Sequence, residues 1–198
     1  MLMHWLTYFY ALKLSNVSIG MLSLFTFPVI TALLEPVLLK TKFQLIHLIL
    51  GGLVIVGIYF LVPEFDINNN YTKALGFGVF SAVCYALRNI IMKSKVSEYN
   101  GSVLMLYQLI IISAVLFPSF FILDTSNIAE EIPAALVLAL LTTALGHTMF
   151  LYSFKHFSTT SVSIMSGVQP IYGILLGMLF LNENPDQSAI LGGALILT

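Results

Sequence analysis

The stretch that most constrains this chain is Ser161–Glu183, SVSIMSGVQPIYGILLGMLFLNE, which carries no charge from Ser161 to Leu181. An apolar run of that length predicts a helix that crosses the hydrocarbon core of a bilayer. Pro170 stands near its centre, where the missing backbone donor predicts a kink. Small residues along one side predict that a neighbouring helix approaches closely. They are Ser163, Ser166, Gly167, Gly173 and Gly177.

The same design occurs earlier in the chain. Pro28 and Pro170 are 142 positions apart, and that spacing also pairs Tyr10 with Tyr152, Lys13 with Lys155, and Gly51 with Gly193. A constant offset without gaps predicts an internal repeat. Two interrupted apolar helices at matching places in two halves are typical of the binding site of a secondary transporter.

Composition sets the class of protein. Of the 198 residues, 59% are hydrophobic and only 9% are charged, whereas a soluble domain carries about a quarter charged residues. We therefore expect a multi-pass protein of the cell membrane, of the bacterial inner-membrane type. The single cysteine, Cys84, lies in an apolar run, which excludes a disulfide framework. The chain has no basic cluster of the kind that binds nucleic acid.

Apolar segments separated by short polar breaks predict an all-α transmembrane helix bundle. The polar sequence PEFDINNNYT at 63–72 predicts a linker between a first repeat at 1–62 and a second repeat at 73–198. The first segment is too short to span a bilayer. The predicted segments are 2–14, 17–39, 43–62, 73–93, 103–123, 132–154, 161–181 and a last one that starts at 188.

Charge in the loops predicts the orientation. Lysines gather in alternate loops, and the remaining loops hold most of the acidic residues. Loops rich in lysine are typically cytoplasmic. The lysines concerned are Lys40, Lys42, Lys93, Lys95 and Lys155. The loop after the first proline-containing helix is then inside and its equivalent at Asn182 is outside, so the two copies are inverted.

The two copies resemble the EamA family of the drug/metabolite transporter superfamily. The second reads LYSFKHFSTTSVSIMSGVQPIYGILLGMLFLNENPDQSAILGGALIL, and the first reads FYALKLSNVSIGMLSLFTFPVITALLEPVLLKTKFQLIHLILGGLVIVG. The resemblance implies two inverted repeats of five helices, of which this chain would hold the third to the tenth, the tenth incomplete. It also implies an acidic residue after each proline-containing helix. Glu183 fits this pattern, but the first copy has Thr41 there.

Three polar residues are candidates for a substrate site. Gln169 lies eight residues after Ser161, about 12 Å along the helix and close to the bilayer midplane. It is expected to contact substrate or to form a hydrogen bond between helices. Tyr85 and Arg88 share a helix face with Ser81 and Asn89, which predicts a polar stripe in the interior. Alternatively, Arg88 extends to the cytoplasmic interface.

The other candidates also have alternatives. Glu35 could carry a coupling proton, or be an interfacial charge near Lys40 and Lys42. His147 could titrate near neutral pH, or be a neutral histidine packed in the bundle. Most tyrosines suit the membrane interface, and Tyr172 is the deepest. We predict a cavity bounded by Pro28, Tyr85, Gln169, Pro170 and Tyr172, with Arg88 and His147 nearer its cytoplasmic mouth.

These features predict an integral membrane permease. It would export a small organic metabolite, such as an amino acid, a nucleoside or a drug-like solute, by alternating access. The alternative is a non-transporting scaffold or accessory protein on the same fold. The sequence has no nucleophile motif, phosphate loop or cluster of metal ligands, so we expect no enzymatic activity, cofactor or metal. The expected partners are the solute and lipid, with homo-oligomerisation left open and no nucleic acid.

The predicted orientation can be tested by thiol labelling. In a Cys84→Ser background, a cysteine introduced at Ser94 should react with an impermeant thiol reagent only from the cytoplasmic side, because its loop holds Lys93 and Lys95. A cysteine introduced at Asn68 should react from outside. Labelling of the Ser94→Cys variant from outside would contradict the predicted orientation.

Overall fold

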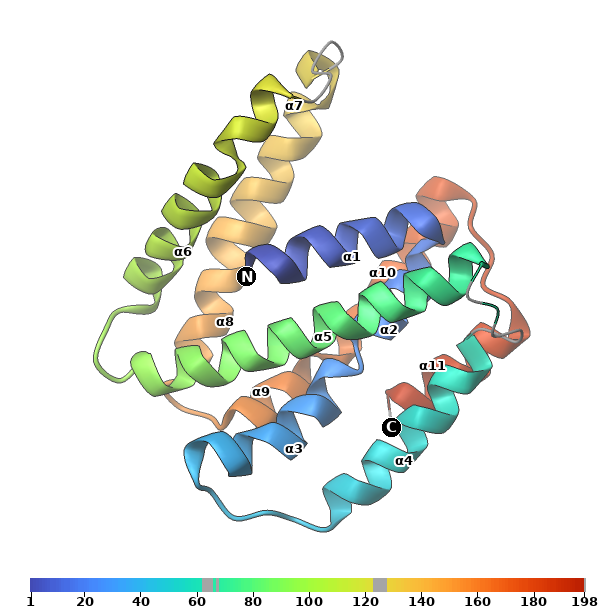
Figure 1. Cartoon of the computed structure of the whole chain (residues 1–198), viewed down its shortest axis with the longest axis horizontal. Helices are drawn as coiled ribbons and strands as arrows, with labels where there is room; N and C mark the ends of the chain where they lie inside the picture. Colours follow the sequence, from blue (N-terminus) through green and yellow to red (C-terminus); the bar gives the residue numbers. More distant parts are fainter. Residues whose placement is uncertain (62–65, 67, 123–127, 198) are drawn as a thin grey trace. The chain divides into compact units, whose positions relative to one another are not determined.

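The chain is built from helices alone in the part described by the computed structural model, which covers residues 1–61, 66, 68–122 and 128–197 (Figure 1). The fold class predicted from the sequence is confirmed. Two compact units can be distinguished, Met1–Ile90 with Thr159–Thr198, and Ile91–Ser158. We call them the repeat unit and the hairpin unit and describe each by itself. Part of the predicted linker, at 63–65 and 67, lies outside the described residues.

The helices follow the predicted segments closely. In the repeat unit they are α1 (Leu2–Leu14), α2 (Val17–Leu24), α3 (Phe27–Leu39), α4 (Ile46–Leu61), most of α5 (Asn70–Lys95), α9 (Thr159–Met165), η3 (Ser166–Val168), α10 (Gln169–Leu181) and α11 (Gln187–Ile196). In the hairpin unit they are α6 (Gly101–Leu116), η1 (Phe117–Phe121), α7 (Ile128–Val137), η2 (Leu138–His147) and α8 (Thr148–Ser153). Among the described residues, five helical runs have the length and apolar composition needed to cross a membrane.

Both proline-containing spans are broken just before the proline rather than at it. The first span stops at Leu24 and resumes at Phe27, with Pro28 in the first turn of α3. The second passes through the short 3₁₀ segment η3 and resumes at Gln169, with Pro170 in the first turn of α10. The first turn tolerates proline because its backbone N–H groups have no partner within the helix.

Hydroxyl groups satisfy backbone carbonyls at both breaks. The hydroxyl of Thr26 donates to the carbonyl of Ser23 at 2.8 Å, and that of Ser166 donates to the carbonyl of Ser163 at 2.6 Å. Thr26 and Ser166 are both buried. Irregular backbone at membrane depth requires such internal partners, because lipid supplies none.

The helix bounds in the structure reproduce the 142-residue offset found in the sequence. The bounds of α3, Phe27 and Leu39, and those of α10, Gln169 and Leu181, differ by the same 142 positions as the two prolines. Each of these helices also ends on a left-handed residue, Lys40 with a φ of 55° and Asn182 with a φ of 54°. Non-glycine residues seldom adopt this conformation, so its occurrence at equivalent positions argues for one ancestral unit.

The backbones of α4 and α11 touch where they cross in the repeat unit. A Cβ atom added to Gly57 would lie 2.8 Å from the carbonyl oxygen of Gly192, and one added to Gly192 would lie 2.6 Å from that of Gly57. Val54, Leu61 and Ile196 form a buried apolar cluster around this crossing. Without a hydrophobic force between helices in lipid, such close backbone packing contributes much of the association.

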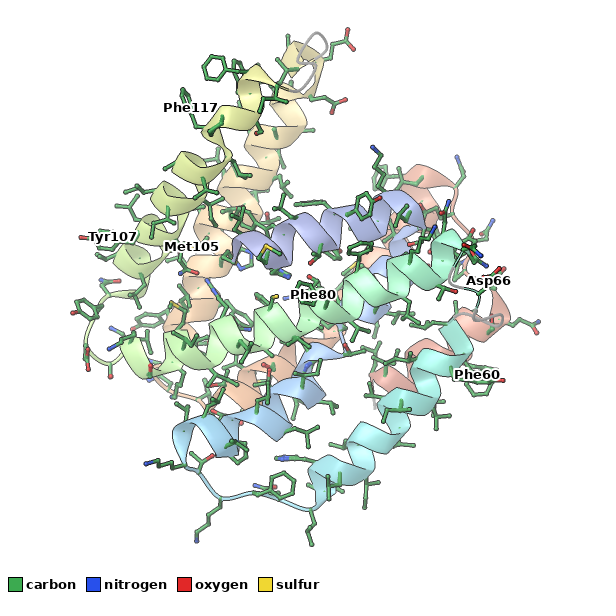
Figure 2. The ribbon with its side chains drawn as sticks, viewed as in Figure 1. Phe60, Asp66, Phe80, Met105, Tyr107 and Phe117 are labelled. Atoms are coloured by element: carbon green, nitrogen blue, oxygen red, sulfur yellow. The ribbon has the colours of Figure 1, made fainter. Side chains whose placement is uncertain are left out.

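The hairpin unit packs α6 beside α8. Met105 of α6 is 1% exposed, whereas Tyr107 and Phe117 are largely exposed and point away from the ribbon (Figure 2). The run from Leu138 to His147 is a π-helix, which the sequence analysis did not predict. Helices of this type are often found at functional sites, although the π-helical turns there are usually single.

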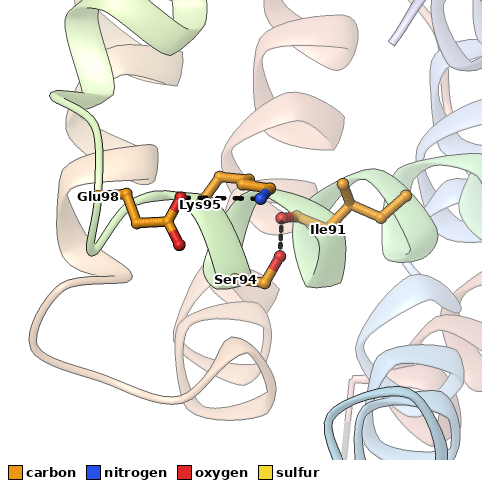
Figure 3. A network of polar contacts seen from close by, with 4 residues as sticks. All are labelled: Ile91, Ser94, Lys95 and Glu98. Carbon is orange, nitrogen blue, oxygen red and sulfur yellow. Dashed lines mark hydrogen bonds and ion pairs between the residues drawn. The ribbon is translucent and has the colours of Figure 1, made fainter.

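Basic residues gather at one end of the hairpin unit. Lys95 pairs with Glu98 at 3.7 Å, and the Ser94 hydroxyl donates to the carbonyl of Ile91 (Figure 3). The ammonium group of Lys93 donates to the carbonyls of Phe154 and Phe157, just after α8. Cations are favoured at the carboxyl ends of helices. Lys93 and Lys155 also line one surface depression, so these lysines lie at the same end of the unit, as the loop charges predicted.

Replacing Gly57 by alanine tests the crossing of α4 and α11. Because the added methyl would lie 2.8 Å from both the carbonyl oxygen of Gly192 and Cγ1 of Ile196, Gly57→Ala should destabilise the protein by about 1–3 kcal/mol. Gly52→Ala on the same helix is the control, since no atom lies within 4 Å of its added methyl. The control should be neutral or stabilising by up to about 1 kcal/mol. Thermal unfolding in detergent measures both, and equal effects would contradict the crossing.

Candidate functional site

Glu35 binds the start of α9 from within α3. Its Oε1 accepts the backbone N–H of Thr159 at 2.8 Å, and its Oε2 accepts the backbone N–H of Thr160 at 2.8 Å and the Thr160 hydroxyl at 2.6 Å. The side chain is 5% exposed. The first N–H groups of a helix lack partners within it and favour negative charge, so this position suits a buried carboxylate. We call this interaction the Glu35 contact.

Glu183 makes a corresponding bond at the opposite end of the same two broken spans. Its Oε2 accepts the backbone N–H of Val17, the first residue of α2, at 2.8 Å. The carboxylate is half-buried. The start of α2 is also capped locally, because the Asn16 side chain accepts the N–H of Ile19 at 2.9 Å. We call the bond from Val17 to Glu183 the Glu183 contact.

The two contacts show that the broken spans are antiparallel. The Glu35 contact joins the end of the first span to the start of the second, and the Glu183 contact joins the end of the second to the start of the first. The inverted relation predicted from loop charges is therefore present in the described helices of the repeat unit.

A buried polar cluster joins α1 to α5. The Ser81 hydroxyl donates to the carbonyl of His4 at 2.9 Å and lies 2.7 Å from Nδ1 of the same histidine. Since the hydroxyl hydrogen is directed at the carbonyl, Nδ1 is the donor in the second bond. The His4 ring stacks on that of Tyr85 with centroids 4.4 Å apart, and Phe27 meets Tyr85 edge-on at 4.8 Å. Tyr85 thus lies beside the break in the first span.

Arg88 extends this cluster by one turn of α5. Its guanidinium donates from Nη1 to Oδ1 of Asn89 at 2.9 Å and lies 6.0 Å from the centre of the Tyr85 ring. Arg88 is 6% exposed and Asn89 is fully buried. The Arg88 side chain is therefore buried rather than extended into solvent at the helix end.

An apolar cavity of about 70 Å³ lies next to both breaks. Pro28 and Ala32 line it from α3, and Ile164 and Gly167 line it from the second span. Residues of α4 and α11, including Val54 and Ile196, complete the wall. Gly167 belongs to this wall, and a methyl group added to it would meet nothing within 4 Å. Of the residues predicted to bound a cavity, Pro28 lines this one.

The other predicted residues are spread over different surroundings. Gln169 and Tyr172 are exposed, so neither lies in the buried cluster around Tyr85. Pro170 is buried in the first turn of α10. His147 is half-buried and belongs to the hairpin unit, at the end of η2. Their involvement in substrate binding stays a prediction.

Sequence reasoning missed the residues that the candidate residues contact. Nothing in the spacing of His4 indicated that it would meet Ser81 and Tyr85, which lie far away in the chain. Thr159 and Thr160 were not considered as partners of Glu35. One signal was available for the contacts, because Val17 and Thr159 are equivalent under the 142-residue offset. Within the described residues, no three His, Cys, Asp or Glu side chains are grouped to hold a metal ion.

The comparisons with known proteins agree with this architecture. An uncharacterized transporter of Archaeoglobus fulgidus is 24% identical over 191 residues, which cover 96% of this chain and 68% of that protein. One crystal structure of a protein superposes with a TM-score of 0.72 at 16% identity, over 100% of this chain and 69% of that one, which shows a shared fold. The sequence profile of the EamA-like transporter family matches residues 1–62 and 72–198. The chain therefore belongs to the EamA-like transporter family, whose members are multi-pass membrane proteins.

Proposed function

We propose that this protein is a permease that exports a small organic metabolite by alternating access between its two repeats. The observation that carries the proposal is the antiparallel pair of broken spans, joined at both ends and flanking a cavity at their breaks. Inverted repeats with discontinuous helices are a common architecture of secondary carriers, and their binding sites lie at such breaks.

The cavity and the polar cluster suggest two parts of a binding region. Apolar walls at Pro28 and Gly167 suit a small hydrocarbon group of the solute. Tyr85 and Arg88 carry a hydroxyl and a guanidinium on α5, and Tyr85 lies beside the break that precedes Phe27. Ionisable residues inside membrane helices are expensive to bury and usually functional. We therefore assign the polar groups of the solute to Tyr85 and Arg88.

Gln169 is the candidate whose role can be tested most cleanly. It follows η3 directly at the break of the second span and is exposed, so its amide is available to a solute or a neighbouring helix. If Gln169 formed a structural hydrogen bond between helices, its amide would be buried, because such bonds are protected from other partners.

Replacing Gln169 by leucine should therefore reduce transport while leaving thermal stability nearly unchanged. Efflux of radiolabelled amino acids and nucleosides from preloaded proteoliposomes measures transport. Gln187→Leu, which removes an exposed amide at the start of α11, is the matched control and should transport normally. Lower stability with unchanged efflux would make Gln169 a packing residue.

The same assay decides between the permease and a scaffold protein. Efflux by the wild-type chain above that of protein-free liposomes supports the permease. If amino acids, nucleosides and drug-like solutes all stay inside the liposomes, the non-transporting alternative is favoured.

A further inference from the structure

The Glu35 and Glu183 contacts bind equivalent positions of the two repeats. Val17 and Thr159 are 142 positions apart, and each is the first residue of its helix. Each donates its backbone N–H to a carboxylate of the other repeat. The geometry of the contact is thus repeated, although the acidic residues are not equivalent in sequence. Thr41 stands at the position equivalent to Glu183, and Gly177 at the position equivalent to Glu35.

The Glu35 contact lies one turn from the cavity. Pro28, Ala32 and Glu35 follow one another at helical spacing, so they share one face of α3. On the second span, Thr160 precedes the lining residue Ile164 by one turn. The bonds between Glu35 and Thr160 therefore tie α3 to α9 between the cavity and the end of the bundle that carries Lys40. A solute could leave the cavity between these helices at that end only after the bonds break.

The two contacts differ in strength. Glu35 accepts three hydrogen bonds and is 5% exposed, whereas Glu183 is half-buried and accepts the N–H of Val17. Water competes for hydrogen bonds that it can reach, and charges in high dielectric attract more weakly. The Glu183 end should therefore open more readily than the Glu35 end.

We propose that the Glu35 and Glu183 contacts are latches that close the two ends of the broken-helix pair in turn, with the Glu35 latch the tighter. The proposal rests on the permease function given above, because a carrier must open its two ends alternately. Both latches are closed in this structure. When the Glu183 latch opens and the Glu35 latch stays closed, the carrier is open towards the Asn182 end. When the Glu35 latch opens and the Glu183 latch stays closed, it is open towards the Lys40 end.

A structural role for the two carboxylates predicts something different. If they only stabilise the fold, removing either one should loosen the whole helix pair. A latch instead acts on one end, so its loss should expose buried positions at that end and leave the other end closed. Two buried serines can report on this difference, Ser163 one turn after Thr159 and Ser18 directly after Val17.

The test measures the rate at which N-ethylmaleimide modifies a cysteine introduced at either serine. The full chain carries Cys84→Ser together with Ser163→Cys or Ser18→Cys, and the rate is followed by mass spectrometry in liposomes. Glu35→Gln should raise the rate at position 163 about tenfold, as expected for loss of hydrogen bonds to a charged group. It should leave the rate at position 18 unchanged or lower. Glu183→Gln should raise the rate at position 18 by a smaller factor and leave position 163 unchanged.

Thr160→Val provides a second, milder variant should Glu35→Gln fold poorly. It removes the bond from the Thr160 hydroxyl at constant shape and keeps both backbone bonds to Glu35. Thr160→Val should raise the labelling rate at position 163 by a smaller factor and leave the rate at position 18 unchanged. The latch proposal is overturned if each carboxylate variant raises the labelling rate equally at both positions. It is also overturned if neither Glu35→Gln nor Thr160→Val raises the labelling rate at position 163.

The labelling rates also separate this proposal from the permease function. They need no solute, so end-specific changes without efflux of any tested solute would support the latches and contradict the permease. Efflux by the wild-type chain without end-specific labelling would support the permease and contradict the latches.

Discussion

The structure depends on one constraint, that a helix broken inside a bilayer must find its hydrogen-bond partners within the protein. Both broken spans meet this constraint locally through hydroxyl groups, from Thr26 in the first and from Ser166 in the second. They meet it at their starts through carboxylates supplied by the other repeat. The two spans are therefore partners in a chemical sense, since each supplies groups that the other needs.

The repeat and the helices could be predicted from the sequence because they depend on local pattern. The 142-residue offset and the apolar segments can be read directly from the sequence. The structure reproduces that offset in the helix bounds and in the left-handed residues Lys40 and Asn182. The breaks themselves were expected at Pro28 and Pro170 and occur just before them. Proline disrupts the turn that precedes it and fits well in the first turn of the next helix.

The candidate site was less predictable because it depends on contacts between distant residues. Glu35 could be placed near the end of its helix from sequence, and an interfacial charge near Lys40 and Lys42 was one expectation. Its partners, the amides of Thr159 and Thr160, lie more than a hundred residues away. The same holds for His4, which becomes a neighbour of Ser81 and Tyr85 only through the packing of α1 on α5. The polar face of α5, by contrast, followed from helical spacing alone, and Arg88 lies in the interior as the stripe predicted.

The central claim is that the two ends of the broken-helix pair open one at a time. Spin labels at Lys40 and Ser161 would report the distance at the Glu35 end, and labels at Asn16 and Asn184 the distance at the Glu183 end. Pulsed electron resonance on each pair, with and without Glu35→Gln, tests the claim most directly. We predict that the substitution adds a longer distance at the first pair and leaves the distribution at the second pair unchanged. Lengthening at both pairs together would contradict the account.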